Sequence, residues 1–159
     1  MDYNQNPIDI VENVVNSKHW VFTRSTDHEL VAEIDSSWCN YRLYFSWSEQ
    51  IKAISITVTF DMRFPETKSI SAHELLAFIN ERLWIGHFDI TSKNGIPAYR
   101  HTVLDSHDNE MLYNQLDDLI DIAIYECEKY YPAFQLVLYD NYLPENALKF
   151  SVMNTIGRA

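Results

Sequence analysis

The chain has 159 residues, of which 47% are hydrophobic and 14% aromatic, so it is long and apolar enough to bury the core of one domain. Its formal net charge of −11 argues against nucleic acid and anionic membranes as partners, because binding to both depends on Lys and Arg. With 3 glycines and no glycine-rich phosphate-binding motif, nucleotide binding through such a loop is also excluded.

A short helix is predicted from Pro7 to Lys18, because proline suits a first helical turn and hydrophobic residues recur there at helical spacing. From Trp20 the hydrophobic period changes to two, which indicates strands. The first hairpin turns near residues 26–28, and the second joins 40–47 to 52–61. The first third of the chain is therefore expected to be one helix followed by two hairpins.

Alternation within the second hairpin assigns its two faces. With a loop centred on Glu49 and Gln50, Leu43 faces Ile56. Tyr44 then points to the opposite face, which is mostly polar. One apolar and one polar face are typical of an antiparallel sheet that is covered on one side only.

A helix is predicted from Ser71 to Trp84, because its first residue and Glu74 match a capping box. A third hairpin follows and turns at 94–95, where Asn-Gly is a strong turn signal. If those two residues form the whole loop, Asp89 lies opposite Arg100 and the two side chains can form an ion pair.

The last third of the chain has a helical pattern from about 112 to 134, within which Pro132 should kink the helix or divide it in two. A final short helix is expected from Pro144. The predicted fold class is α+β: an antiparallel sheet covered on one face by helices, in one domain spanning 1–159.

Tests for catalytic and metal-binding motifs are negative. The segment His73–Ala77 begins like the zinc-protease motif HExxH, but alanine replaces the second histidine. His87 and His101 are predicted on opposite sheet faces, where they cannot share an ion. We therefore expect a protein that is not an enzyme and has no cofactor or metal.

Acidic residues gather between Asp105 and Glu128, with no Lys or Arg among them. They are interpreted either as the solvated outer face of the long helix or as a docking strip for a basic partner. Nothing in the pattern indicates a buried acid, which a pair of catalytic carboxylates would need.

The cysteines, Cys39 and Cys127, are too few for a disulfide framework or a zinc cluster. No signal peptide opens the chain, and no apolar stretch is long enough to span a bilayer. The expected compartment is the cytoplasm.

The chain has more aromatic residues than the buried face of one sheet requires for its core. Tyr44 lies on the polar face of its strand, and Trp38 and Trp47 lie near strand ends. Exposed Tyr and Trp are favoured anchors in protein interfaces, so these residues are candidates for protein binding. Packing beneath loops is the alternative interpretation.

Three stretches, Trp38–Phe45, Asn80–Phe88 and Tyr130–Gln135, together resemble the bacterial YbjN-like proteins, described as sensory transduction regulators. The resemblance extends over nearly the whole chain, from about Pro7 to Val152. It implies a fold like that of type III secretion chaperones, which are small, acidic and often dimeric. It supplies no catalytic residues, and fold alone does not define function.

The expected function is therefore that of a non-enzymatic cytoplasmic regulator or chaperone-like module that binds a protein of unknown identity. We also expect a homodimer, with Trp84 and His87 at its interface. The alternative is a small-molecule sensor or enzyme with a pocket between sheet and helices.

Overall fold

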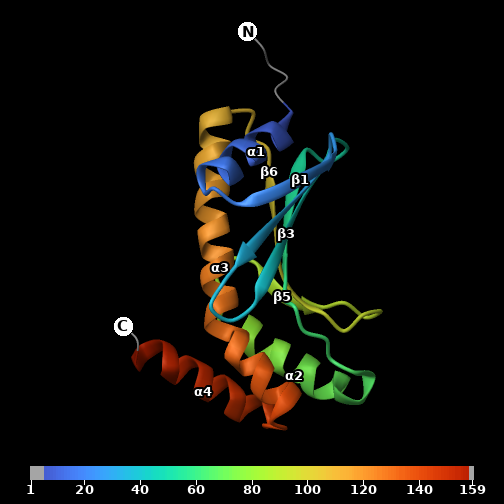
Figure 1. Cartoon of the computed structure of the whole chain (residues 1–159), viewed down its shortest axis with the longest axis vertical. Helices are drawn as coiled ribbons and strands as arrows, with labels where there is room; N and C mark the ends of the chain where they lie inside the picture. The colour runs from blue at the N-terminus through green and yellow to red at the C-terminus, as the bar shows by residue number, and fades with distance from the viewer. Residues whose placement is uncertain (1–5, 158–159) are drawn as a thin grey trace.

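The computed structural model describes residues 6–157, with side chains up to residue 153, and shows helices along one face and at one end of an antiparallel sheet (Figure 1). The six strands are ordered β1-β2-β3-β4-β6-β5. In chain order the elements are α1 (Pro7–Ser17), β1 (Val21–Thr26), β2 (Glu29–Asp35), β3 (Asn40–Ser48), β4 (Ala53–Thr59), the 3₁₀ turn η1 (Glu66–Lys68), α2 (Ser69–Asn80), β5 (His87–Ile90), β6 (Pro97–Leu104), α3 (Asn109–Tyr139) and α4 (Pro144–Gly157). The predicted α+β class and the single covered sheet face are confirmed.

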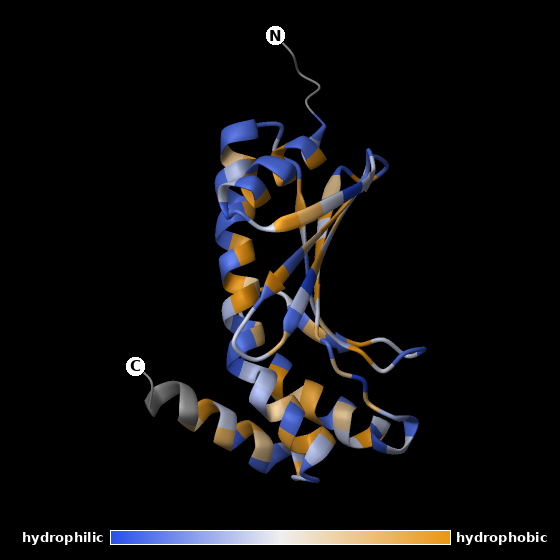
Figure 2. Cartoon of the chain, in the orientation of Figure 1, coloured by the Kyte–Doolittle hydropathy of each residue, from blue (hydrophilic) through white to orange (hydrophobic). Residues whose placement is uncertain are grey.

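The core lies between the sheet and the helices, as the alternating pattern requires. Along β3, Tyr41, Leu43 and Phe45 are buried, and the residues between them are exposed. Aromatic rings from strand and helix meet edge to face in this layer: the Phe60 and Phe134 ring centroids are 5.3 Å apart. Figure 2 shows hydrophobic and hydrophilic residues alternating along the strands and along α3. No helix in the described part of the chain is both long and apolar enough to cross a membrane.

Both predicted hairpin registers are wrong by two residues, and both faces are nevertheless assigned correctly. In the β3–β4 pair, Leu43 lies opposite Val58, because the loop comprises the four residues 49–52. The loop is centred one residue later than predicted, and Lys52, with a left-handed φ of 53°, closes it. Because side chains alternate between the two faces along a strand, a shift of two residues leaves every residue on its predicted face.

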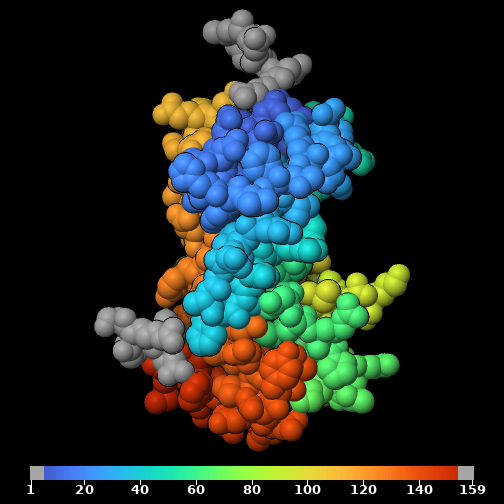
Figure 3. All heavy atoms as spheres, in the orientation of Figure 1, coloured from blue at the N-terminus to red at the C-terminus, as the bar shows by residue number. Residues whose placement is uncertain are grey.

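In the β5–β6 pair, Ile90 lies opposite Pro97, and the loop extends from 91 to 96. Gly95 does not form the predicted two-residue turn, because its carbonyl accepts a 2.8 Å hydrogen bond from the Phe64 N–H. The predicted ion pair does form: Arg100 Nε is 3.5 Å from Asp89 Oδ2, along a diagonal of the ladder. Figure 3 shows the tip of this hairpin projecting beside η1 and α2.

Helix α2 begins and ends earlier than predicted. It follows η1 directly, so Ser71 lies inside the helix and the proposed capping box with Glu74 is wrong. Before it, the Lys68 ammonium donates a 2.7 Å hydrogen bond to Asn141 Oδ1, just beyond α3. The helix ends at Asn80, whose side chain hydrogen-bonds the backbone of Phe88 in the edge strand β5.

Helix α3 continues through Pro132 without being divided, and Figure 1 shows it bending in its lower part. Its acidic outer face is partly neutralised by a residue that is distant in sequence. Lys18 Nζ, at the end of α1, is 2.7 Å from Asp117 and 3.0 Å from Asp121.

Candidate functional site

The sheet face opposite the helices, here called the open face, has no covering element among the described residues (Figure 1). It combines short hydroxyl side chains with a similar number of charged or basic ones. Its central residues are Thr23, Val31, Glu33, Arg42, Tyr44, Ser46, Ser55, Thr57, His87, Asp89, Arg100 and Thr102. Short polar residues leave a surface with little relief, so a large side chain on it is well placed to contact a partner.

Tyr44 is one of the large side chains of this face. It remains 38% exposed and belongs to a row of cross-strand neighbours that passes through every strand of the sheet. The row runs Thr23, Val31, Tyr44, Thr57, Arg100 and His87. At about 4.8 Å between strands, His87 lies roughly 14 Å from Tyr44. The structure therefore brings a predicted protein-binding residue and a predicted dimer residue onto one surface.

Arg100 supplies the cationic group of this row, and sequence reasoning did not single it out as a binding residue. Its Nε is buried and has no hydrogen bond among the described residues. The 3.5 Å separation from Asp89 is an ion-pair distance and not a good hydrogen-bond length. The ion pair holds the guanidinium beside Asp89, and the partly exposed side chain can offer its terminal N–H groups to a partner's carboxylates or carbonyls. Only the correct register, with Arg100 beside His87, would have revealed the row.

Trp38 and Trp47 do not join Tyr44. Trp38, in the loop before β3, stacks on Tyr131 of α3 with ring centroids 6.0 Å apart. Trp47, near the other end of β3, packs against the core, with the Lys52 ammonium 6.0 Å from its ring centroid. The two tryptophans are roughly 30 Å apart along the strand direction. Their role in binding stays a prediction, and it would involve separate surfaces.

Trp84 is 100% exposed in the segment between α2 and β5, three residues before His87. His87 is exposed at the start of the edge strand. The backbone of this strand is already occupied: Asn80 contacts both the N–H and the carbonyl of Phe88, at 2.8 and 3.0 Å. Contacts made here by another molecule would therefore involve side chains more than strand pairing.

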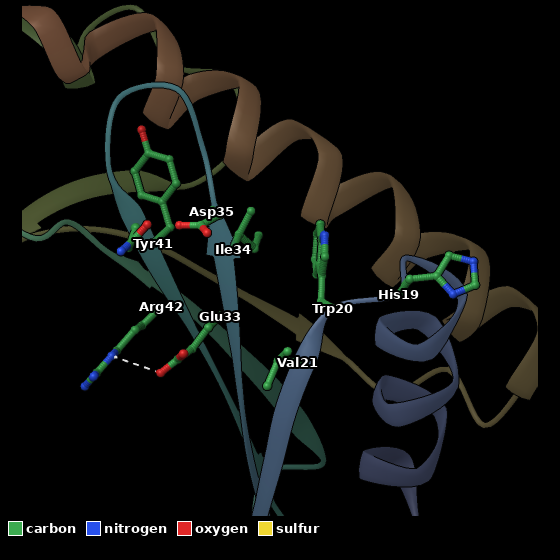
Figure 4. Close-up of a pocket in the computed structure, with 9 residues that line it drawn as sticks. His19, Trp20, Val21, Glu33, Ile34, Asp35, Tyr41 and Arg42 are labelled. Carbon is green, nitrogen blue, oxygen red and sulfur yellow. Dashed lines mark ion pairs between the residues drawn. The ribbon is translucent and has the colours of Figure 1, made fainter.

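A hollow of about 470 Å³ lies at the end of the sheet where β1 begins (Figure 4). The Arg42–Glu33 ion pair, at 3.6 Å, borders it on the open face. Trp20 and Tyr41 line its inner side, and Figure 4 shows both rings directed toward α3. This sheet-end hollow adjoins the open face and extends the surface available to a partner.

No described Asp or Glu belongs to the buried core, but two carboxylates of α3 turn partly inward. Glu126 of α3 is half-buried, and burial raises the pKa of its carboxyl above the ordinary value. Its Oε2 is buried without a hydrogen bond among the described residues. Glu128 also turns inward, where it accepts a hydrogen bond from Ser36 and a 3.3 Å bond from the Tyr41 hydroxyl. Sequence periodicity missed both acids because they flank the buried Cys127.

Burial also shifts the pKa values of the two cysteines and of one strand histidine, His101. Burial raises the pKa of the Cys39 thiol to about 12 and that of Cys127 well above its usual range, so both thiols are protonated at neutral pH. Burial, with His87 nearby, lowers the pKa of His101. Within the described residues, no three His, Cys, Asp or Glu side chains are grouped as metal ligands.

The chain matches one family model over residues 7–136: YbjN, described as "Putative bacterial sensory transduction regulator". The chain belongs to the YbjN family. The match includes all three stretches that carry the resemblance in the sequence. A solved structure, "Crystal structure of YbjN, a putative transcription regulator from E. coli", is 8% identical and aligns over 76% of this chain and 90% of that one, with a TM-score of 0.47.

No curated protein matches significantly. Assignment to the YbjN family therefore depends on the family model. The likeness to type III secretion chaperones, inferred from the sequence, stays a prediction.

Proposed function

We propose that this YbjN-family protein is a non-enzymatic cytoplasmic regulator that binds another protein through the open face of its sheet. The observation that carries the proposal is the row through Tyr44, Arg100 and His87, which is exposed on a face that no described element covers. The family's description as a regulator agrees with a binding role.

The chemistry of the row suits a protein partner. Tyrosine and arginine are enriched at the energetically important centres of protein interfaces, because they bring large area and directional hydrogen bonds. Tyr44 lies near the middle of the sheet, and Arg100 lies two strands away. The surrounding Ser and Thr hydroxyls can hydrogen-bond the backbone of an extended segment, which is a chaperone-like mode of binding.

The test compares proteins captured by the wild type, by Tyr44→Ala and by Arg100→Gln, with Tyr125→Ala as the matched control. Tyr125 is 56% exposed on α3, in the opposite layer, so its removal takes away a similar side chain elsewhere. A partner retained by the wild type and the control but lost by both open-face variants supports the proposal. Equal recovery by all four proteins refutes it.

The alternative of a small-molecule sensor is favoured by a different observation, a groove of about 520 Å³ between the β5–β6 loop and α2. This volume is typical of small-ligand sites. The groove does not include the open-face row, so the two functions can be tested separately.

A further inference from the structure

The groove between the β5–β6 loop and α2, here called the loop groove, differs from the rest of the molecule in charge. Arg63, Lys93 and His73 line it, and Glu66 is its one carboxylate. The chain as a whole has a net charge of −11, so a locally cationic hollow is unusual on this surface. We propose that the loop groove binds a small multivalent oxyanion, carrying phosphate or carboxylate groups.

The Arg and Lys side chains of the loop groove have no ion-pair or hydrogen-bond partner among the described residues. Most described Lys and Arg side chains contact a carboxylate, a carbonyl or an aromatic ring. Lys18, Arg24, Arg42, Lys52, Lys68, Arg100, Lys129 and Lys149 all do so. Among the described residues, Arg63, Arg82 and Lys93 have no ion pair or hydrogen bond. Two of these three side chains line the same hollow.

The wall formed by the β5–β6 loop is held in place before any ligand arrives. Thr91 ties both sides of the loop, because its carbonyl accepts from the Gly95 N–H at 2.7 Å and its N–H donates to the Ile96 carbonyl at 3.1 Å. Gly95 in turn packs on the backbone of Phe64, which joins the loop to the opposite wall. A preformed wall lowers the entropy lost on binding.

His73 adds a polar group on the α2 side. Its Nδ1 is 2.7 Å from the Ser69 carbonyl oxygen, so Nδ1 carries the proton and donates to that oxygen. Nε2 is then the ring nitrogen left for a ligand. Together with Arg63 and Lys93, this arrangement is suited to oxygen atoms bearing negative charge.

The experiment is an amide NMR titration of the whole chain with pyrophosphate and, separately, with citrate, at constant ionic strength. Saturable shifts confined to residues 63–73 and 90–95 are expected with one or both probes. If only pyrophosphate causes saturable shifts, the ligand carries phosphate groups, and if only citrate does, the ligand carries carboxylates. If both do, the groove binds oxyanions in general. Absence of saturable shifts in this region with either probe overturns the proposal.

Charge variants make the test specific. Arg63→Gln and Lys93→Gln should each weaken binding about tenfold, the usual effect of losing a charge-assisted hydrogen bond. Arg82→Gln removes the same charge outside the groove and should change affinity by less than about twofold. Glu66→Gln should strengthen binding, because it removes the repelling carboxylate. Equal weakening by Arg82→Gln, or no gain with Glu66→Gln, contradicts binding in the groove. Neither result bears on the open face.

Discussion

Asn80 shows how a single side chain shapes the edge of the sheet. It ends α2 and holds the N–H and carbonyl of Phe88, a residue that is 2% exposed. A side-chain amide can imitate a neighbouring strand in this way, because it presents one donor and one acceptor in the same plane. The edge strand β5 is thereby paired on both sides at this point.

Asn80→Ala should lower the free energy of unfolding by about 1–3 kcal/mol, because a buried backbone N–H loses its acceptor. Chemical denaturation measures the loss, and amide exchange at Phe88 should become faster. Asn114→Ala is the control, since Asn114 is exposed on α3, and its effect should be within about 0.5 kcal/mol. Unchanged exchange at Phe88 in Asn80→Ala would show that another group protects this amide.

A second prediction at the level of single residues concerns Glu126, whose burial should make the stability of the protein depend on pH. Burial raises its pKa in the folded state, so folding favours the protonated form. The penalty for burying the charge is therefore absent below the ordinary pKa of 4.5 and grows as pH rises through the folded-state pKa. Glu126→Gln should be more stable than the wild type at pH 7, and the gain should disappear in acid.

Denaturation midpoints measured across pH test this directly. Glu128→Gln is the informative comparison, because Glu128 accepts hydrogen bonds from Ser36 and Tyr41 and its replacement should destabilise the fold. If Glu126→Gln is instead the less stable variant at pH 7, the Glu126 carboxylate has a stabilising partner and the argument from burial fails.

At the scale of elements, the hairpin β5–β6 depends on one glycine. Gly95 has a φ of +69°, and a Cβ there would lie 2.1 Å from the Phe64 carbonyl oxygen. Gly95→Ala should destabilise the protein by more than about 1–2 kcal/mol, the contribution of the backbone conformation alone. Ser92→Ala, in the same loop, should be nearly neutral by denaturation. Equal stability of the two variants would mean that the loop readily moves away from Phe64.

The same glycine explains where sequence reasoning failed. Period-two alternation correctly assigned the strands and their faces, since parity survives a shift of two residues. The length of the β5–β6 loop was wrong, because Gly95 is used for a contact with Phe64, which lies far away in sequence. Local patterns contain no information about such a contact.

Helix boundaries show the same limit. The apolar spacing of α2 and α3 predicted both helices. The end of α2, however, is determined by the Asn80–Phe88 contact, and the Lys18 pairing with α3 joins residues about a hundred positions apart. Of the candidate site, Tyr44 could be placed on the open face by alternation alone. Arg100, two strands away in the same row, required the three-dimensional register.

At the scale of the whole molecule, the exposure of Trp84 and His87 supports the proposal of a homodimer. We predict that the wild type sediments as a dimer at about 50 µM, above the dissociation constant expected of a stable pair. Trp84→Ser should shift it to monomer, because a fully exposed tryptophan is a strong interface anchor. Tyr139→Ser removes another exposed aromatic residue, at the end of α3, and should leave the dimer intact. A monomeric wild type would refute the proposal.

The two edge strands of the sheet, β1 and β5, differ from each other, and this limits how copies of the protein can pair strand to strand. At β5, the Phe88 amide is taken by Asn80, and the Ile90 amide is taken by its neighbour Asp89 at 2.8 Å. Along β1, the side-chain contact to the strand backbone among the described residues is at its end, where Arg24 Nε donates a 3.4 Å hydrogen bond to the Thr26 carbonyl. A fibre built by strand pairing needs two edge strands with free backbone hydrogen-bonding groups on every copy. With two of its amides already hydrogen-bonded, β5 is the less available of the two edge strands for pairing between copies.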